Sequence, residues 1–322
     1  MESPAEAGPS SLTVPRVEAP LVTILLCTFN GETFLEAQLA SLERQVHKNW
    51  RLIVSDDGST DGTLALLDQF ARRVPQSVEL RSGPRQGPAT NFLSLAADPQ
   101  IDGDYFAFCD QDDIWYPEKL QVALDRLQSI GEHKPVVYGA RTHLIGAEGR
   151  DSGFAPLFDK PPTFANALAQ SIAGANTMMF NRAVKRLFER TGMLEVVSHD
   201  WWAYQLVCGS GGVLIYDHEP HLDYRQHSGN HIGCNRGLRA QWMRLLMILR
   251  GGFAHWHDVN VAALEQSRPC LTDAARAELD TFKTMRTGNL PTRLRAFAKS
   301  NIRRQSLQGN VALLLAILLK KL

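Results

Sequence analysis

Three carboxylates crowd into one short loop of this chain. Residues 110–113 read Asp-Gln-Asp-Asp and directly follow the apolar run 105–109, which is typical of a buried strand. Carboxylates this close repel each other unless a cation or hydrogen-bond donors hold them. Mg²⁺ and Mn²⁺ prefer oxygen ligands and keep positions open for phosphate oxygens. The loop therefore predicts a divalent-cation site, although a solvated loop before a helix start at 116–118 also fits these residues alone.

The elements that must position this loop alternate between strand and helix. We expect strands at 21–27, 50–55, 78–81, 105–109 and 135–142, with helices at 32–44, 60–73, 88–97 and 117–129. This rhythm indicates a mostly parallel sheet with helices on both faces. Polar clusters also follow the first two strands, at 28–32 and 55–59. Right-handed crossovers bring such strand ends to one edge, so the three polar loops are expected to line one cleft.

The second half of the chain is less regular. We expect a Gly/Pro-containing loop at 149–162, helices at 164–171, 182–191 and 198–207, and strands at 176–180, 212–216 and 221–226. Beyond residue 236 the pattern becomes helical and basic.

The amino-acid composition limits the kinds of protein that this chain can be. The 322 residues are 44% hydrophobic and 21% charged, which is ordinary for a soluble globular protein of one or two domains. The formal net charge is zero, which by itself argues neither for nor against nucleic acid. We expect no nucleic-acid partner. Five scattered cysteines fit a reducing cytosol better than a disulfide framework. Residues 1–20 are polar and rich in Pro, Ser and Glu, so they predict a disordered leader rather than a signal peptide.

Four segments carry a resemblance to a known family. They are 22–31 (Val-Thr-Ile-Leu-Leu-Cys-Thr-Phe-Asn-Gly), 54–63 (Val-Ser-Asp-Asp-Gly-Ser-Thr-Asp-Gly-Thr), 108–115 (Phe-Cys-Asp-Gln-Asp-Asp-Ile-Trp) and 224–227 (Tyr-Arg-Gln-His). In this order they resemble the motifs of family 2 glycosyltransferases of the GT-A fold, in the bacterial rhamnosyltransferase-like branch. The resemblance covers about 22–237. It implies a GT-A domain at 21–235, Rossmann-like with a mostly parallel sheet and flanking helices, followed by a basic helical C-terminal region at 236–322.

The resemblance implies a site for a nucleotide-diphosphate sugar. Asp57 would accept a hydrogen bond from the imino N–H of a uracil or thymine base. Read from the residues alone, Asp56 and Asp57 equally suit the capping of the helix expected near Thr60. The full set of residues that the resemblance assigns to nucleotide-sugar binding is Thr28, Asn30, Glu32, Asp57, Arg85, Asn91, Asp110, Asp112 and Arg225.

The same resemblance assigns a metal site and a base. Asp112 would bind Mg²⁺ or Mn²⁺ bridging the diphosphate, and His227 would approach the metal or the phosphates. Asp200 would be the general base that takes the acceptor's proton, an assignment for which a helix N-cap is the alternative. The family has an acidic residue before this aspartate, whereas here His199 precedes it.

The C-terminal region is strongly basic. Between 281 and 322 there are nine Lys or Arg residues and no Asp or Glu, which suggests an anionic partner surface. A basic amphipathic stretch at 236–250 is typical of membrane interfaces. The nine apolar residues 311–319 would span about 13 Å as a helix, too short to cross a bilayer. The sequence fits peripheral membrane contact of this region, and it equally fits helix-on-helix packing against the catalytic domain or a second subunit.

The sequence thus predicts an inverting, metal-dependent glycosyltransferase. It would move a sugar from a nucleotide-diphosphate donor, with dTDP-L-rhamnose as one candidate, to a hydroxyl of a bacterial surface glycan or lipid-linked acceptor. We expect it in the cytoplasm or on the inner face of the cell membrane. A catalytically silent nucleotide-sugar-binding scaffold and a sugar nucleotidylyltransferase are the alternatives. An NAD-dependent oxidoreductase fits poorly, because no Gly-x-Gly-x-x-Gly follows the first strand.

Overall fold

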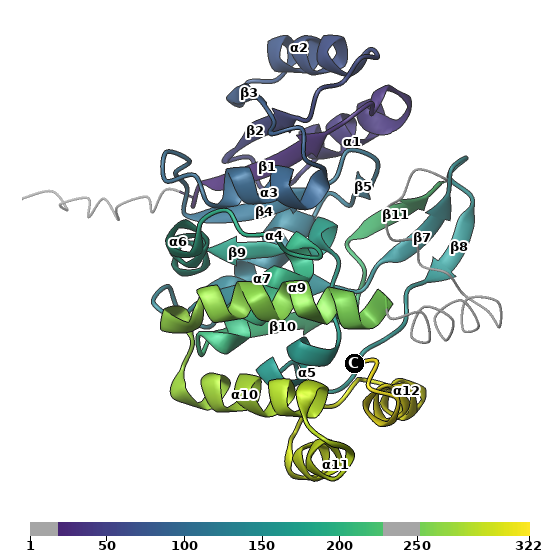
Figure 1. The fold of residues 1–322 in the computed structure, drawn as a ribbon. Coiled ribbons are helices and arrows are strands. Elements are labelled where there is room, and N and C mark those ends of the chain that lie inside the picture. The colour runs from purple at the N-terminus through teal and green to yellow at the C-terminus, as the bar shows by residue number, and fades with distance from the viewer. Residues whose placement is uncertain (1–18, 228–251) are drawn as a thin grey trace, which may run out of the picture.

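A seven-stranded sheet forms the centre of the molecule (Figure 1). The computed structural model describes residues 19–227 and 252–322. The strands run in the order β10-β6-β9-β4-β1-β2-β3. Their bounds are β1 (Val22–Thr28), β2 (Trp50–Asp56), β3 (Val78–Ser82), β4 (Tyr105–Cys109), β6 (Val136–Ala140), β9 (Met179–Asn181) and β10 (Val213–Asp217). Strands β4, β1, β2 and β3 are parallel neighbours, as are β10 and β6, while β9 runs antiparallel between β4 and β6.

Helices cover both faces of this sheet. They are α1 (Glu32–Glu43), α2 (Thr63–Arg73), α3 (Pro88–Ala96), α4 (Lys119–Gln128), α5 (Phe164–Ala169), α6 (Arg182–Thr191) and α7 (His199–Gly209). Successive side chains of a strand point to opposite faces. Ile24 of β1 therefore packs in one apolar cluster with Leu39 of α1, and Leu25 packs in the other with Phe92 of α3. The mostly parallel α/β sandwich expected from the alternating pattern is confirmed.

A second, four-stranded sheet was not predicted. It has the order β5-β11-β7-β8, formed by β5 (Ile114–Trp115), β11 (Leu222–Gln226), β7 (His143–Gly146) and β8 (Asp151–Phe154). The expected loop at 149–162 contains β8, whose residues are mostly exposed and give no apolar alternation. Gly149, at φ 78°, makes the turn between β7 and β8. The strand expected at 176–180 is instead a 3₁₀ turn, η1 (Ala175–Thr177), followed by β9.

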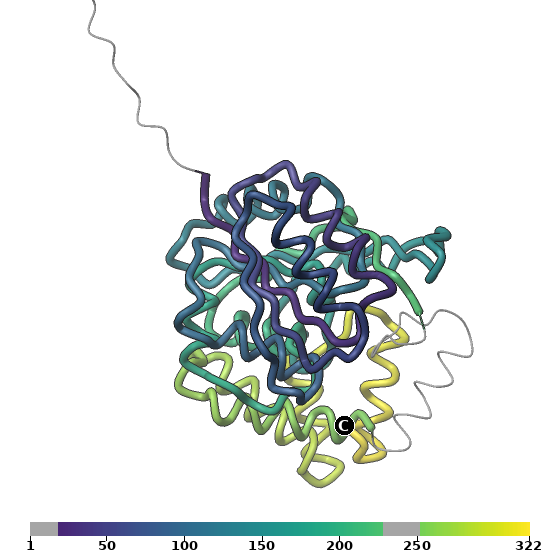
Figure 2. The backbone as a smooth tube through the Cα atoms, turned by 90° about the horizontal axis from the view of Figure 1, so that it is seen from above, coloured from purple at the N-terminus to yellow at the C-terminus, as the bar shows by residue number. Residues whose placement is uncertain are grey.

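The C-terminal helices pack onto the α/β layers. They are α9 (Gly252–Gln266), η2 (Arg268–Cys270), α10 (Asp273–Thr287), α11 (Leu290–Lys299) and α12 (Leu307–Leu318). Leu264, Phe282 and Ile317 belong to the same apolar cluster as Phe92 and Trp202. Seen from above, these green-to-yellow helices emerge from beneath the first half of the chain (Figure 2). The basic helix expected at 236–250 and nearly all of the expected leader lie outside the described residues.

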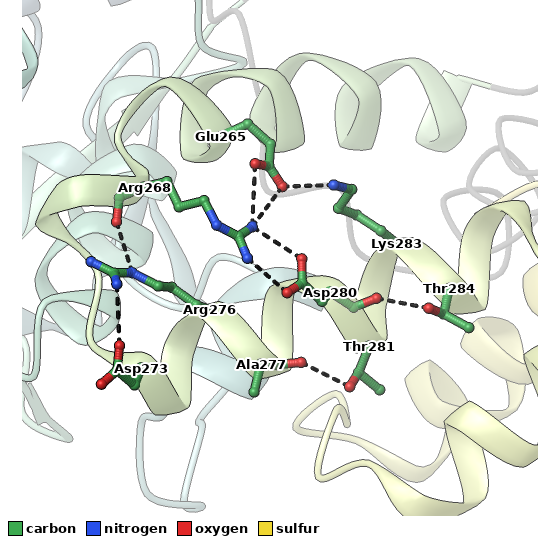
Figure 3. A network of polar contacts seen from close by, with 9 residues as sticks. All are labelled: Glu265, Arg268, Asp273, Arg276, Ala277, Asp280, Thr281, Lys283 and Thr284. Atoms are coloured by element: carbon green, nitrogen blue, oxygen red, sulfur yellow. Dashed lines mark hydrogen bonds and ion pairs between the residues drawn. The ribbon is translucent and has the colours of Figure 1, made fainter.

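A network of charges joins α9 to α10 (Figure 3). Arg268 contacts Asp280 at 2.7 Å and Glu265 at 3.1 Å, and Lys283 contacts the same Glu265 at 2.8 Å. One cation shared between two helices fixes their relative position better than isolated surface pairs would. Among the described residues, no helix is long and apolar enough to cross a membrane.

Candidate active site

The loops after β1 and β2 are hydrogen-bonded to each other at one edge of the sheet. The Thr28 hydroxyl donates to the Asp56 carboxylate at 2.9 Å, and the backbone N–H of Asp57 donates to the Thr28 carbonyl at 2.8 Å. Asp56 also accepts from the backbone N–H of Ser59 at 2.8 Å. Asp56 is buried by these contacts and shapes the turn, which leaves Asp57 as the outward carboxylate of the pair.

Asn30 and Glu32 continue this junction. Asn30, at φ 48°, accepts from the backbone N–H of Thr60 at 2.9 Å through its side-chain oxygen. Glu32 accepts from the backbone N–H of Gly62 at 3.0 Å, while its own N–H donates to Asp61 at 3.1 Å. Both side chains therefore bind the neighbouring loop in the structure. Direct nucleotide contact by Asn30 and Glu32 stays a prediction.

The Asp57 carboxylate organises the segment before α3. It accepts from the backbone N–H groups of Arg85 at 2.6 Å and Gly87 at 2.9 Å. Arg85 has a positive φ of 59° and is exposed, so its guanidinium lies on the surface beside this turn. Asn91, by contrast, is buried, and its amide is bonded on both sides to Ser55 of β2. The structure thus brings Asp57 and Arg85 together and leaves Asn91 behind them, where it holds α3 against β2.

Gln111 connects the acidic loop to the first loop. Its side-chain amide accepts from the backbone N–H of Phe29 at 2.9 Å and donates to the Phe29 carbonyl at 3.0 Å. A Cβ atom at Gly31 would overlap the Gln111 side-chain amide, so a larger residue there would displace Gln111 from its bonds to Phe29. Sequence reasoning did not single out Gln111, because the spacing of the aspartates says nothing about the residue between them.

Asp112 of the acidic loop contacts His227, and Asp110 lies close to Asp112 in the same loop. Burial raises the pKa of Asp110 to about 8, with the charges of Asp112 and Asp200 adding to the effect. The His227 ring nitrogen Nε2 lies 2.7 Å from Oδ2 of Asp112, although the two residues are 115 positions apart. Of the predicted metal ligands, Asp112 and His227 are therefore neighbours in the structure.

These residues fit a divalent cation that is shared with a substrate. Crowded carboxylates with a raised pKa gain from a nearby positive charge. Within the described residues no group of three or more His, Cys, Asp or Glu side chains is placed so that it could hold a metal ion by itself. Mg²⁺ usually takes one or two carboxylates from the protein and further oxygens from phosphates and water. Asp112 and His227, with Asp110 beside them, match that incomplete kind of site.

The third aspartate of the loop has a structural role. Asp113 is fully buried and accepts from the Asn176 side chain at 2.6 Å and from the Arg225 backbone N–H at 3.2 Å. The Arg225 guanidinium donates to the carbonyls of Asp112 at 3.1 Å and Ala147 at 2.9 Å. Arg225 thus supports the acidic loop from behind. A direct contact between Arg225 and the donor remains a prediction.

Lys119 is a further charged residue that sequence reasoning missed. It is buried, and its Nζ lies 3.4 Å from the centroid of the Trp115 ring. Burial lowers the pKa of Lys119 to about 7, while Cys109, Asp113 and Asp110 act in the opposite direction. The only sign of it in the sequence is a lysine six positions after the last aspartate of the loop. A lysine there looks like an ordinary surface residue at the start of a helix.

Asp200 lies in the first turn of α7. Burial raises the pKa of its carboxyl, whereas hydrogen bonds from Ser198 and from the backbone N–H of Trp201 lower it. A raised pKa makes a carboxylate a stronger base once it is ionised. The preceding His199 is buried against the Phe92 ring with a centroid distance of 4.0 Å, and burial lowers its pKa to about 3. His199 therefore faces the apolar core rather than solvent.

Fold and site together define a glycosyltransferase, with strand-end loops, paired aspartates and a separate carboxylate at one edge of a parallel sheet. Residues 23–188, about half of the chain, match the family described as glycosyl transferase family 2. The chain belongs to this family, which assigns it to the glycosyltransferases rather than to the sugar nucleotidylyltransferases.

Curated relatives agree with that assignment. The dTDP-rhamnosyl transferase RfbG of Shigella flexneri is 26% identical over 232 residues, covering 69% of this chain and 78% of the relative. The putative teichuronic acid biosynthesis glycosyltransferase TuaG of Bacillus subtilis is 26% identical over 177 residues, covering 55% of this chain and 66% of the relative. The expected resemblance to rhamnosyltransferase-like members of the family is confirmed.

Solved structures confirm the GT-A fold. TarS of S. aureus in complex with UDP-GlcNAc aligns with a TM-score of 0.55 at 17% identity, covering 92% of this chain and 79% of that chain. The mannosyltransferase PcManGT of Pyrobaculum calidifontis, in complex with GDP-Man and Mn²⁺, aligns with a TM-score of 0.50 at 18% identity, covering 95% and 88%. At these identities the likeness establishes the fold alone.

Proposed function

We propose that this enzyme is an inverting, metal-dependent glycosyltransferase that uses a nucleotide-diphosphate sugar. The observation that carries the proposal is the meeting of Asp110, Asp112 and His227 at the strand edge, with Asp200 close enough to influence the charge of Asp110. The donor to test first is dTDP-L-rhamnose, because the Shigella relative is a dTDP-rhamnosyl transferase. The acceptor proposed is a hydroxyl of a bacterial surface glycan or of a lipid-linked saccharide.

The donor would lie across the three loops. Thr28, Asn30, Glu32 and Asp57 are the proposed nucleotide side, and Asp57 still has lone pairs to offer a base N–H beyond its two backbone partners. On the phosphate side, we propose the residues Arg85, Asp110, Asp112 and Arg225, with the buried Asn91 supporting the start of α3 behind them. Asp112 and His227 would hold Mg²⁺ or Mn²⁺, which offsets negative charge on the departing nucleoside diphosphate.

The chain's own part in the reaction is proton removal and orientation. Asp200 would accept the proton of the acceptor hydroxyl as its oxygen forms a bond to the anomeric carbon. The bond from that carbon to the diphosphate breaks on the opposite side, which inverts the configuration. The partly buried surroundings of Asp200 and Asp110 strengthen electrostatic interactions in the site.

We further propose a cytoplasmic enzyme with peripheral contact to the inner face of the membrane through 236–322. A lipid-linked acceptor would make such contact useful, since enzyme and acceptor would meet on one surface. The basic composition of 281–322 supports this part of the proposal.

Calorimetric binding of dTDP, UDP and GDP, each with and without Mn²⁺, tests the donor site. Wild type should bind dTDP or UDP in a metal-dependent manner, and Asp112→Ala should lose that dependence. Asp273→Ala is the matched control, because its carboxylate is 99% exposed on α10. If wild type bound none of the three nucleotides, with or without metal, the donor site would be refuted and the silent scaffold favoured.

A further inference from the structure

The outer face of α12 is a continuous apolar surface. Its exposed side chains recur at helical spacing and belong to Leu307, Val311, Leu315, Leu318 and Leu319. Leu307 is 80% exposed and Leu319 is 52% exposed, so these side chains are not tucked against neighbouring elements. Residues at these intervals share one side of a helix. Large exposed apolar patches usually mark a surface that contacts a partner or a membrane.

The opposite face holds α12 firmly on the protein. Leu313, Ala316 and Ile317 are buried in the main apolar cluster. The Arg293 guanidinium donates to the Ile317 carbonyl, and the Arg286 guanidinium donates to the carbonyl of Leu322 at 3.1 Å. The helix is therefore anchored on one side and open on the other, which is the arrangement of a fixed docking surface.

Charge around this face selects the kind of partner. Arg295 and Lys299 of α11 and Lys320 after α12 are exposed. No Asp or Glu occurs anywhere between 281 and 322. The C-terminal segment 281–322 therefore combines an apolar stripe with exposed cations and no acidic side chain of its own, which complements a surface that is apolar inside and anionic outside, as a bilayer with anionic lipids is.

We propose that the outer face of α12 docks this protein on an anionic lipid membrane. The apolar stripe runs from 307 to 319, about 18 Å along the helix, against about 30 Å of hydrocarbon, so α12 would lie in the plane of the interface. The exposed lysine and arginine side chains would reach the headgroups. A second copy of the chain is a poorer occupant, because self-association through this face would bring the cations of 281–322 close to the same cations of the other copy.

The helix α12 lies on the same side of the molecule as two strands next to the site. In Figure 1, α12 lies on the side that also holds β5 and β11, the strands that flank Asp112 and carry Arg225. The inference deepens the membrane contact of the proposed function. Its test needs neither donor nor acceptor, so it stands or fails separately from the transferase assignment.

Flotation of the full chain with lipid vesicles tests the surface. Wild type should float with vesicles of phosphatidylcholine mixed with phosphatidylglycerol and stay behind with phosphatidylcholine alone. The double variant Leu315→Glu/Leu319→Glu should lower the bound fraction about tenfold, because two carboxylates would enter the interface. Leu64→Glu is the matched control, since Leu64 of α2 and Leu315 are both 42% exposed. It should float like wild type.

Three results would overturn the proposal. In the first, wild type does not float with the anionic vesicles. In the second, the double variant floats as well as wild type. In the third, light scattering shows that wild type is dimeric while the double variant is monomeric. The third result would show that a second copy of the chain, and not a membrane, covers the outer face of α12. The far-UV circular dichroism spectrum and the urea unfolding midpoint measured without lipid should be equal in wild type and both variants, which confirms that they are folded.

Discussion

Asp110 and Asp200 are both partly buried carboxyl groups, yet their surroundings favour different chemical roles. Asp110 lies beside Asp112, and like charge adds to burial in raising its pKa to about 8. Asp200 instead receives hydrogen bonds from Ser198 and backbone N–H groups that favour its ionised form. A cation suits the first environment, whereas the second suits a base that exchanges a proton with an acceptor.

Asp200→Asn tests the base directly. The amide keeps the size of the carboxylate and cannot accept a proton, so turnover should fall about 10³-fold. Binding of dTDP with Mn²⁺ should change less than about twofold, a difference below roughly 0.5 kcal/mol. Release of dTDP from dTDP-rhamnose, measured with a panel of saccharide-diphospholipid acceptors, gives the rate. Full turnover by the variant would show that another group removes the proton.

At the scale of elements, the three site loops are held to each other rather than carried separately. Gln111 joins the acidic loop to Phe29, and Thr28 joins the β1 end to Asp56 at the β2 end. Since each neutral hydrogen bond contributes about 1 kcal/mol, the two bonds of Gln111 couple the nucleotide side to the metal side. The Phe29 side chain is 55% exposed, so a solvent-exposed aromatic ring borders this junction.

Gln111→Met should uncouple the two sides. Methionine has a similar length and makes neither hydrogen bond, so thymidine monophosphate without metal should bind nearly as before. The affinity for dTDP with Mn²⁺ should fall about tenfold, which corresponds to about 1.4 kcal/mol. Titration calorimetry of both ligands measures the difference, and Gln121→Met on α4 provides the control. Equal weakening of both ligands would argue against coupling through Gln111.

The pattern of apolar residues predicted the elements that build the site, but not the contacts between them. Strands β1, β2 and β4 are fully or almost fully buried, so their sequences carry a strong signal. β8 has exposed residues and a glycine, so it gave none. The bonds of Gln111 and the burial of Lys119 depend on how distant loops meet. Spacing along one chain does not contain that information.

For the molecule as a whole, the C-terminal helices share the core of the catalytic layers. His257 of α9 is buried at this junction, where its ring meets Trp201 of α7 at 5.7 Å and Phe282 of α10 at 5.1 Å between centroids. Its Nδ1 has no hydrogen-bond partner within the part of the chain that the structure describes. Burial lowers the pKa of His257 to about 3, and the charges of Arg286 and Arg304 add to this.

Acid should therefore loosen this junction. The unfolded chain binds a proton at His257 near its ordinary pKa of about 6.5, whereas the folded protein resists protonation down to about 3. The contribution of the neutral His257 to the free energy of unfolding is thus fully present above pH 6.5 and is lost as the pH falls toward 3. Between pH 8 and pH 5 the loss from this group is about 2 kcal/mol.

His257→Phe keeps an aromatic ring at the junction and removes the titrating group. Urea unfolding at pH 8 and pH 5 should give wild type a larger drop in the free energy of unfolding than the variant, by about 2 kcal/mol. His255→Phe is the control, because His255 is exposed on the same helix and should leave the wild-type drop intact. An equal drop in wild type and His257→Phe would mean that His257 does not stay neutral in the folded core.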